Sequence, residues 1–336
     1  MVGSAAVNQD RPLIYRALAK LIMGTQRRPV ILIDGSDLSA DREFHLLRAS
    51  IPVMGRALTM YEESHRQCDE GNPQVHKRFL RQLKKVLPHD CHPIVVTDAG
   101  FRTPWFRAVV AMGWDFVGRV GGPTRVSAAD EEDGMRVERV FERATTRGRY
   151  LGEMDLVRKN ALRCHAYLLK KKKQGRIKKT VFGKRGEMKQ SQKNAHRERT
   201  LWLIVTSLDN RYANTQQILN LYKTRMQIEE GFRDIKNSRW GLSFNEARCT
   251  TTYRYENLLL VAHLATLAVW LIGKIAELKQ GHRHYQANTV KTQKVLSTFF
   301  LGLEVIRRSA DNFMKNDFID AIKQLQLQHK EACCYA

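Results

Sequence analysis

Two continuous apolar runs that each end in an aspartate constrain the fold of this chain more than any other feature. The first is PVILID at residues 29–34, and the second is PIVVTD at residues 93–98. Runs without polar alternation are typical of strands that are buried on both faces of a sheet. The chain is therefore predicted to be an α/β protein. Asp34 and Asp98 would lie at strand ends, where functional groups gather in an open α/β sheet.

The segments around these runs fit the same fold class. Apolar residues at helical spacing predict three helices, at residues 13–23, 73–87 and 103–113, the last with a threonine cap. Further buried-type runs predict three strands, at residues 57–63, 114–120 and 201–208. One long amphipathic helix is predicted from Asn214 to Lys236, and the chain from Tyr253 to Gln328 is predicted to be helical.

The charge of the chain narrows the class of its partner. Lys and Arg number 57 against 34 Asp and Glu, which gives a formal net charge of +23. A surplus of this size favours a polyanionic partner, with nucleic acid first and an anionic membrane surface second. The longest apolar stretch, residues 258–273, is shorter than the ~20 residues that span a bilayer and is predicted to be a buried helix. The start of the chain has no apolar signal core, and the six cysteines have no metal-ligand spacing, so a cytoplasmic protein is predicted.

The stretch from residue 121 to residue 199 differs in composition from its surroundings. It contains the acidic EED and then becomes strongly basic, with KKKK and RIKK close together. Its periodicity is weak, so it is predicted to be an insertion of short strands and basic loops. Such charge runs are often only a solvated surface, but phosphate contact is favoured here because nucleic acid is the expected partner. The residues predicted to make that contact are Lys171, Lys172, Lys178 and Lys179.

A third acid, Glu229, lies on the long amphipathic helix, so three carboxylates could meet at the strand ends. Hard cations such as Mg²⁺ are held by one or two carboxylates together with substrate phosphates. Two such ions about 3.5–4 Å apart can activate an attacking oxygen and stabilise a leaving oxygen in phosphoryl transfer. Spacing alone leaves a second interpretation open, because strand-end aspartates are commonly turn or cap residues.

The residues around the three acids resemble a known family. YKTRMQIEEGFRDIK spells Y-(2)-R-(3)-E-(6)-K through Tyr222, Arg225, Glu229 and Lys236, which resembles the signature of DDE-type cut-and-paste transposases of bacterial insertion sequences. VILIDGSDL and VVTDAGFRTPWF resemble the first and second aspartate motifs of that family. LLRASIPVMGRALTMYEE and HYQANTVKTQKVLSTFFLGLEVIRRS are also similar to it. The resemblance covers nearly the whole chain in the family's order.

The resemblance implies an RNase H-like catalytic core with a β-rich insertion and a helical C-terminal region. The implied segments are a core at residues 29–120 and 200–240, the insertion at residues 121–199 and the helical region at residues 241–336. Residues 1–28 would be the remnant of the helical N-terminal domain of the family. The chain is therefore expected to be an N-terminally truncated transposase.

The resemblance also implies roles for individual residues. Asp34, Asp98 and Glu229 would bind Mg²⁺, for which Mn²⁺ can substitute, and would carry catalysis. Tyr222 and Arg225 would contact the transposon-end phosphates, and DNA contact is also expected of Lys236 and of Trp240, which lies just beyond it. Residues three and four apart share a helix face, so the first three of these and Glu229 are predicted to form one stripe. Trp240 is expected to stack on an unpaired base.

The implied function is metal-dependent cleavage of DNA at transposon ends and strand transfer into target DNA. The expected partners are terminal inverted repeats, target DNA and a second copy of the chain in a synaptic homodimer, in the bacterial cytoplasm near the nucleoid. A first alternative is a truncated, catalytically inactive DNA-binding remnant or an inhibitor of the full-length transposase. A second is a general RNase H-like nuclease or resolvase, which does not explain the pattern of Tyr222, Arg225 and Lys236.

Several neighbouring residues are expected to have ordinary structural roles. Asp37 is expected to be a turn residue, because the acid directly after the apolar strand is the ligand in the family pattern. Glu230 is turned about 100° away from Glu229 on a helix and is expected to be an exposed carboxylate. Trp202 is expected to lie in the core, and His263 to be a hydrogen-bonded core histidine. Cys164 and His165 lack further ligands, and no zinc site is expected there.

Overall fold

A computed structural model of the chain describes ten stretches of the sequence. These are residue 3 and residues 5–121, 124–128, 134–157, 160–171, 201–211, 213–237, 242–286, 294–308 and 312–333. The described residues divide into two compact units. Unit 1 is formed by residues 1–93 and 224–334, and unit 2 is formed mainly by residues 94–223.

Unit 1 contains three antiparallel strands in the order β3-β2-β1. They are β1 (Val30–Asp37), β2 (Phe44–Val53) and β3 (Arg56–Arg66). The predicted strands at residues 29–34 and 57–63 are confirmed within β1 and β3, but β2 was not predicted. All ten β2 residues are buried. The charged Arg48 can be buried among them because it has an ion-pair partner on β3. β2 was missed because the prediction relied on continuous apolar runs, which the polar residues of β2 interrupt.

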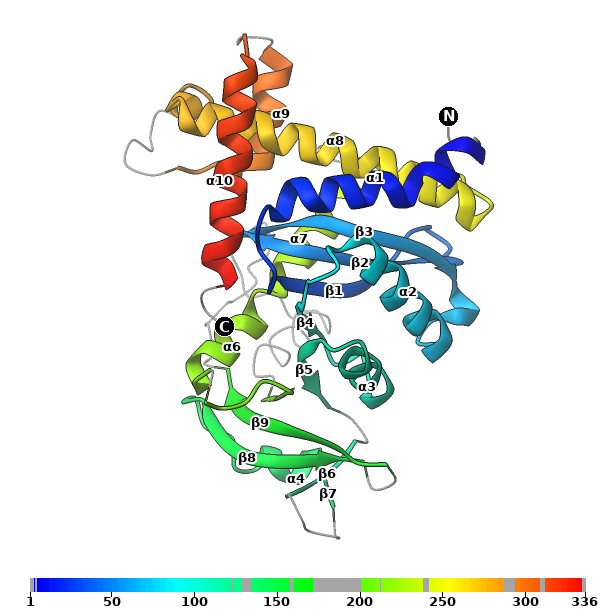
Figure 1. The fold of residues 1–336 in the computed structure, drawn as a ribbon, viewed down its shortest axis with the longest axis vertical. Helices are drawn as coiled ribbons and strands as arrows, with labels where there is room; N and C mark the ends of the chain where they lie inside the picture. The colour runs from blue at the N-terminus through cyan, green and yellow to red at the C-terminus, as the bar shows by residue number, and fades with distance from the viewer. Residues whose placement is uncertain are drawn as a thin grey trace, which may run out of the picture. The chain divides into compact units, whose positions relative to one another are not determined.

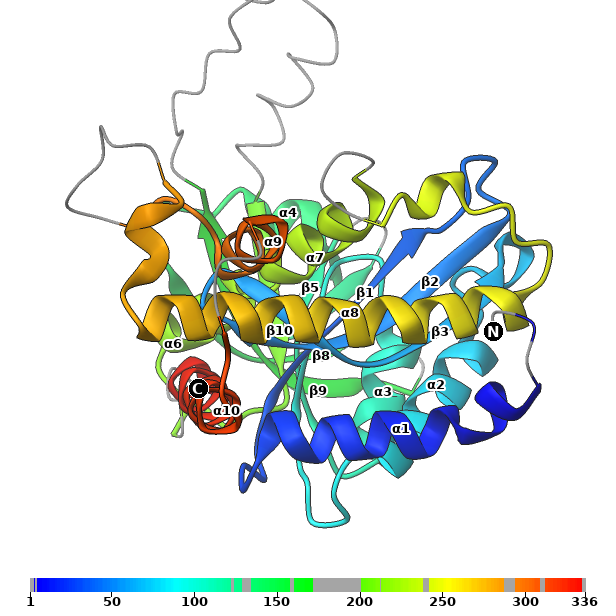
Figure 2. The same cartoon turned by 90° about the horizontal axis from the view of Figure 1, so that it is seen from above.

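Helices cover the strands of unit 1. The larger helices are α1 (Ala5–Met23), α2 (Pro73–Val86), α7 (Met226–Lys236), α8 (Thr252–Leu278), α9 (Thr298–Arg308) and α10 (Lys315–Cys333). Three short 3₁₀ turns are η1 (Gln67–Asp69), η2 (Phe244–Glu246) and η3 (Gly281–His284). Helices α1 and α8 lie side by side and both contact β3 (Figures 1 and 2). α7 packs against all three strands, which places it next to the end of β1.

α8 is the helix that contains the longest apolar stretch. It crosses α9 so closely that a Cβ added to Gly273 would lie 1.8 Å from the carbonyl oxygen of Thr298, so only glycine fits there. Among the described residues, α8 is long and apolar enough to cross a membrane, but half of its most apolar window is buried. Core helices of soluble proteins pass the same test, so α8 is no evidence of a membrane protein.

Unit 2 contains seven described strands in the order β4-β5-β10-β9-β8-β6-β7. They are β4 (Ile94–Thr97), β5 (Asp115–Val120), β6 (Arg125–Ala128), β7 (Met135–Arg136), β8 (Arg149–Leu156), β9 (Leu162–Lys170) and β10 (Leu201–Thr206). β4 and β5 are parallel, and the other neighbouring pairs are antiparallel. The described helices of unit 2 are α3 (Thr103–Ala111), α4 (Val137–Phe141) and α6 (Thr215–Lys223). β8 and β9 form a long hairpin (Figure 1).

The predicted fold class is confirmed. The strands at residues 94–97, 115–120 and 201–206 agree with prediction, as do the helical segments after residue 252. Strands β6 to β9 supply the β-rich character that was predicted for the insertion. Residues 172–200, which include most of the predicted basic loop, lie outside the described residues.

The prediction of one helix from Asn214 to Lys236 is wrong. α6 ends at Lys223 and α7 begins at Met226. Between them, the amide of Gln227 donates to the carbonyl of Thr224, and the next amide donates to the carbonyl of Arg225. These 3₁₀-type bonds interrupt the regular α-helical pattern. The predicted threonine cap of α3 is also wrong, because the cap residue is Arg102 and its side chain makes no capping hydrogen bond.

Candidate active site

β1 carries Asp34 from the core of unit 1 toward its surface. The four residues before it, Val30 to Ile33, are completely buried, whereas the Asp34 side chain is 14% exposed. Its Oδ1 accepts a hydrogen bond of 2.9 Å from the amide of Gly35. Asp34 thus lies where the buried part of the strand ends, as its sequence predicted.

α7 carries Glu229 on the side of the helix that is not in the core. Ile228, Phe232 and Ile235 form the buried face of the helix, while Glu229 lies beside that face with its side chain 38% exposed. α7 packs against β1, so the carboxylate of Glu229 lies near groups at the end of that strand.

The guanidinium of Arg225 joins the two acids. Its Nη1 lies 3.0 Å from Oδ2 of Asp34, and its Nη2 lies 2.6 Å from Oε1 of Glu229. Ionised partners make hydrogen bonds of this kind short and strong. The structure therefore brings together three residues that the sequence placed 191 and 4 positions apart.

Lys236, near the other end of α7, also reaches β1. Its Nζ donates a 2.7 Å hydrogen bond to Oγ of Ser36. Burial lowers the pKa of Lys236, the carboxylate of Asp37 opposes this shift, and the nearby positive charge of Arg48 adds to it. α7 thus places two cationic side chains, Arg225 and Lys236, beside the end of the first strand.

The carboxylates of unit 1 have the chemistry of a site for a divalent cation. Asp34 and Glu229 face a single positive group, and Mg²⁺ is typically held by one or two carboxylates with substrate phosphates. The guanidinium of Arg225 shows that this arrangement accommodates a cation. Within the described part of the chain, no group of three His, Cys, Asp or Glu side chains is close enough to hold a metal ion.

Asp98 belongs to unit 2 and directly follows β4. β4 is fully buried, and Asp98 is the first partly exposed residue after it. Its Oδ1 accepts a 2.8 Å hydrogen bond from the amide of Gly100, which fixes the turn into the next helix. Its position after a buried strand agrees with the sequence prediction.

Tyr222 does not share a helix with the other signature residues. It lies on α6, is 2% exposed, and packs its ring edge-on against Trp202 at 4.9 Å. The predicted stripe of four residues on one helix is therefore wrong, because α6 and α7 are separate helices. Trp202 is 5% exposed, which confirms its predicted core position, and Nζ of Lys171 lies 4.6 Å from the centre of its ring. Trp240, Lys172, Lys178 and Lys179 lie outside the described residues.

A groove in unit 2 contains functional candidates that the sequence did not reveal. It has a volume of about 730 Å³, and its lining includes Ala99, which directly follows Asp98. Four arginines line it, Arg102, Arg107, Arg119 and Arg125, together with Phe101, Phe106 and Phe141. Arg102 directly precedes α3, Arg107 lies in α3, and the other two lie on β5 and β6. The four form no run in the sequence, so no local pattern could have identified them.

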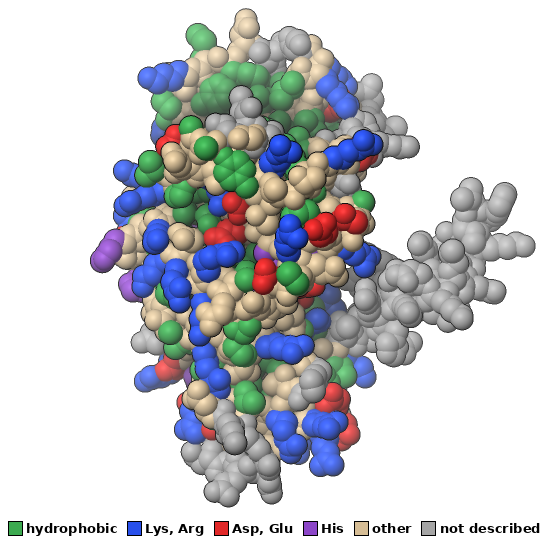
Figure 3. All heavy atoms as spheres, turned by 90° about the vertical axis from the view of Figure 1, so that its right-hand side faces the viewer, with side chains coloured by type: hydrophobic (Ala, Val, Ile, Leu, Met, Phe, Trp, Pro, Cys, Tyr) green, Lys and Arg blue, Asp and Glu red, His purple; other side chains and the backbone are tan. Residues whose placement is uncertain are grey.

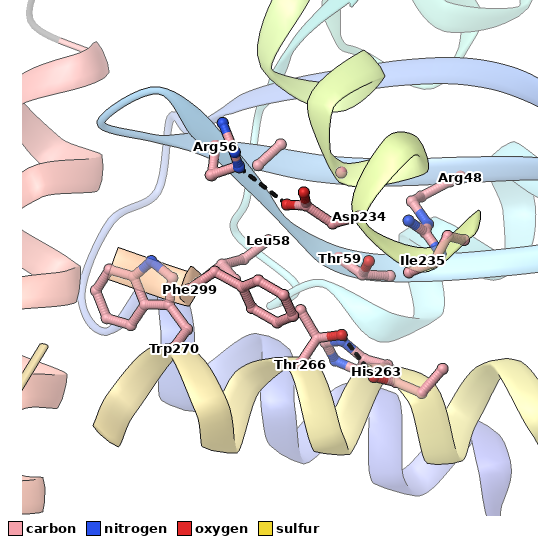
Figure 4. A pocket seen from close by; sticks show the side chains of 13 residues that line it. Arg48, Arg56, Leu58, Thr59, Asp234, Ile235, His263, Thr266, Trp270 and Phe299 are labelled. Carbon is pink, nitrogen blue, oxygen red and sulfur yellow. Dashed lines mark hydrogen bonds and ion pairs between the residues drawn. The ribbon is translucent and has the colours of Figure 1, made fainter. Parts of the chain in front are cut away.

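Another missed set of contacts holds α7 in place. Gln227 accepts a 3.0 Å hydrogen bond from the amide of Val53, and Nε of Arg56 lies 2.9 Å from Oδ2 of Asp234. Figure 4 shows the second pair at one side of a small pocket whose other walls include Trp270 and Phe299. These contacts fix α7 to the β2–β3 hairpin, on a side of the helix away from Glu229.

His263 lines the same small pocket (Figure 4). It is 4% exposed, which confirms that it lies in the core, and its ring stacks on Tyr15. The expectation that it is fully hydrogen-bonded is wrong, because no described residue pairs with its Nε2. Burial lowers the pKa of His263 to about 3, so the ring is neutral at physiological pH.

The two acids next to the candidate ligands have other partners. Asp37 is the last residue of β1 and pairs with Nδ1 of His45 at 3.2 Å. Glu230 was expected to be exposed, but its side chain is only 29% exposed because it pairs with Arg233 at 2.8 Å and lies 3.9 Å from Arg56. Both acids therefore differ from Asp34 and Glu229, which share Arg225.

Positive charge is spread over the face of the molecule that Figure 3 shows. Figure 3 shows one face, on which Lys and Arg side chains are scattered with smaller groups of Asp and Glu between them. A broad distribution suits contact with a long polyanion better than recognition of one small anion.

A model of the transposase DDE domain family matches residues 25–267, and the chain belongs to this family. The mixed α/β architecture is consistent with the RNase H-like fold that was predicted. Membership implies a metal-dependent DNA-cleaving enzyme, with DNA as its partner. No match was found among curated proteins.

Proposed function

We propose that this chain catalyses cut-and-paste DNA transposition, by cleaving transposon ends and joining them to target DNA. The observation that best supports the proposal is the convergence of Asp34 and Glu229 on one guanidinium, in a member of the transposase DDE domain family. This juxtaposition supports the proposal, because two carboxylates from distant parts of the chain share one cationic partner.

The proposed metal ligands are Asp34, Asp98 and Glu229, and the proposed ion is Mg²⁺, with Mn²⁺ as a substitute. When bound, such ions activate the attacking oxygen and stabilise the leaving oxygen of the phosphodiester. The carboxylates supply hard oxygen ligands and the negative charge that a divalent ion requires. Lys236 lies on the same helix as Glu229, Arg225 directly precedes that helix, and both can offset the charge of the scissile and neighbouring phosphates.

The proposed DNA contacts extend beyond α7. In unit 2, the arginine-lined groove offers guanidinium groups for phosphates and aromatic walls for bases. Lys171 lies on Trp202 near the start of the basic segment, and Lys172, Lys178 and Lys179 would continue its phosphate contacts. Trp240 would stack on an unpaired base. Tyr222 would contact an end phosphate, and because its ring is buried, its substitution should affect packing as well.

The proposed reaction has four steps. Water attacks the phosphodiester at the transposon end and releases a 3′-hydroxyl. That hydroxyl attacks the opposite strand, which closes a hairpin and breaks the bond to flanking DNA. A second water reopens the hairpin, and the regenerated 3′-hydroxyl attacks target DNA. Each step exchanges one phosphodiester oxygen for another, so no covalent protein–DNA intermediate is required. A homodimer bound to two ends, in the bacterial nucleoid, is the proposed assembly.

Adjacent carboxylates on α7 provide a matched test of this proposal. Nicking of supercoiled plasmid in Mg²⁺ or Mn²⁺ should be lost in Glu229→Gln, because Glu229 is a proposed metal ligand. It should persist in Glu230→Gln, since Glu230 pairs with Arg233 and has no proposed role in the reaction. Equal nicking by the two variants would contradict the assignment of Glu229.

The net charge of +23 favours one alternative, a DNA-binding protein that does not cleave DNA. Such a protein would bind plasmid with a steep salt dependence through its basic surface. Retained plasmid binding without nicking in any metal, by the wild-type chain, would favour this alternative over the proposed enzyme.

A further inference from the structure

The ion pairs of Arg225 support an inference that rests on the proposed function and extends it. We propose that Arg225 is a cationic placeholder for the divalent ion. Its guanidinium pairs with Asp34 and Glu229 before metal binds, offsetting one of their two negative charges, and it leaves them when metal binds. Arg225 thereby makes metal binding depend on the presence of a new partner for its own charge, namely a DNA phosphate.

The geometry places the guanidinium between the two acids and does not fork it onto one of them. One terminal nitrogen serves Asp34 at 3.0 Å, and the other serves Glu229 at 2.6 Å. The side chains of Arg225 and Asp34 are only 13% and 14% exposed, so little water screens their contact, whereas the side chain of Glu229 is 38% exposed. The guanidinium therefore occupies a defined position between the two carboxylates when neither metal nor DNA is bound.

A divalent ion and the guanidinium would compete for the same place. Asp34 and Glu229 would hold the ion, and Arg225 already contacts both carboxylates, through Oδ2 of Asp34 and Oε1 of Glu229. Two cations a few ångströms apart in a poorly solvated site repel each other strongly. Binding of an ion between these oxygens therefore requires Arg225 to swing away.

The rest of α7 is held by contacts that do not involve Arg225. Val53 contacts Gln227, Arg56 contacts Asp234, and Lys236 contacts Ser36. Arg225 itself precedes the first residue of the helix and has a long side chain. Its guanidinium can consequently move without unseating the helix that carries Glu229.

Charge balance explains why DNA would favour this movement. Two carboxylates and one guanidinium leave one negative charge, which a divalent ion reverses to one positive charge if Arg225 stays nearby. A DNA phosphate then neutralises the site and gives the guanidinium a partner that it binds well. Metal and DNA should therefore bind cooperatively, and linkage makes the enhancement equal in both directions.

The test measures Mn²⁺ binding to the full chain by electron paramagnetic resonance, without DNA. Loss of the signal in Asp34→Asn identifies the ions bound at this site. Arg225→Ala and Arg225→Gln should bind Mn²⁺ about tenfold more tightly than the wild type, because no charge-assisted contacts have to be broken. Arg233→Ala is the matched control, since Arg233 makes a surface ion pair on the same helix, and its affinity should equal that of the wild type.

A second arm adds a short duplex of random sequence to the same titration. The duplex should tighten Mn²⁺ binding by the wild type and leave Arg225→Ala unchanged, which is the signature of the proposed coupling. Equal or weaker Mn²⁺ binding in both Arg225 variants without DNA would overturn the placeholder role and leave the proposed function intact. Absence of saturable Mn²⁺ binding in the wild type and all variants would overturn the metal site, and the placeholder role with it.

Discussion

The site around Asp34 in unit 1 and the groove beside Asp98 in unit 2 differ in how their charged side chains are paired. In unit 1, Asp34 and Glu229 both pair with Arg225, which offsets one of their two negative charges. In unit 2, four arginines line a groove of about 730 Å³ among whose described lining residues there is no Asp or Glu. One region therefore has to exchange an internal partner before it binds a cation, whereas the described lining of the other offers guanidinium groups to an anion.

The same contrast continues into the core of unit 1. Asp34, Arg48 and Glu62 lie in register across β1, β2 and β3. Arg48 is 5% exposed and Glu62 is completely buried, and they pair at 2.7 Å. Oε1 of Glu62 also accepts a hydrogen bond from Tyr15, whose pKa is raised mainly by burial. Internal charge pairing is thus a general feature of unit 1.

The largest expected effect concerns this buried pair. Glu62→Gln should lower the free energy of unfolding by about 3–5 kcal/mol, because it leaves the Arg48 charge buried without its ionised partner. Arg66→Gln is the control, since Arg66 pairs with Glu43 at the surface and should change stability by less than about 1 kcal/mol. Urea denaturation followed by circular dichroism measures both. Similar small losses in the two variants would remove the distinction between buried and surface pairing in unit 1.

The second largest expected effect is a loss of stability of unit 1 at low pH. Burial lowers the pKa of His263 to about 3 and that of His329 to about 4, below their ordinary value near 6.5, and both residues lie in unit 1. The unfolded chain binds more protons than the folded chain in this range, so the stability of unit 1 is full above about pH 6.5 and falls as pH decreases. Each histidine should lower stability by about 2 kcal/mol at pH 5.

Hydrogen exchange at pH 7 and pH 5, corrected for the intrinsic rates, measures this effect separately in each unit. The protection of β1, β2 and α8 should fall more than that of β8 and β9. His263→Leu should reduce the acid sensitivity of unit 1, whereas His89→Ala, at an exposed position, should leave it unchanged. Equal loss of protection in both units would contradict the assignment of the acid response to these histidines.

The smallest expected effect concerns the groove of unit 2. Replacement of Arg119 or Arg102 by Ala should weaken DNA binding severalfold and reduce the salt slope of log K by about one, because each removes one phosphate contact. Arg211→Ala is a suitable control, since Arg211 pairs with Asp209 on the surface of the same unit. Fluorescence anisotropy over a range of salt concentrations gives both quantities. An unchanged slope in the groove variants would remove the groove from the DNA interface.

The parts of the fold that the sequence predicted depend on local patterns. β1, β4 and α2 have apolar runs or stripes that require no distant partner for their interpretation. β2 was missed because its buried Arg48 becomes acceptable only when Glu62 on another strand pairs with it. The break between α6 and α7 was missed because the apolar periodicity continues through it, and periodicity does not report where helical hydrogen bonds are interrupted.

The candidate site was likewise predicted only in part. Motif resemblance predicted that Asp34 and Glu229 belong together, and the structure brings them to one guanidinium. It did not predict that Arg225 would bridge them, because the partner of a long cationic side chain depends on the folded structure. The arginine groove was missed for a related reason, since α3, β5 and β6 each contribute residues that are unremarkable alone.

The most direct test of the proposed enzyme is metal-dependent nicking of supercoiled plasmid by the full chain and by Asp98→Asn. Asp98 is the one proposed ligand in unit 2, and its hydrogen bond with Gly100 can be kept by the asparagine side chain. We predict nicking by the wild type in Mg²⁺ or Mn²⁺ and none by the variant, with unchanged plasmid binding. Undiminished metal-dependent nicking by Asp98→Asn would contradict the account.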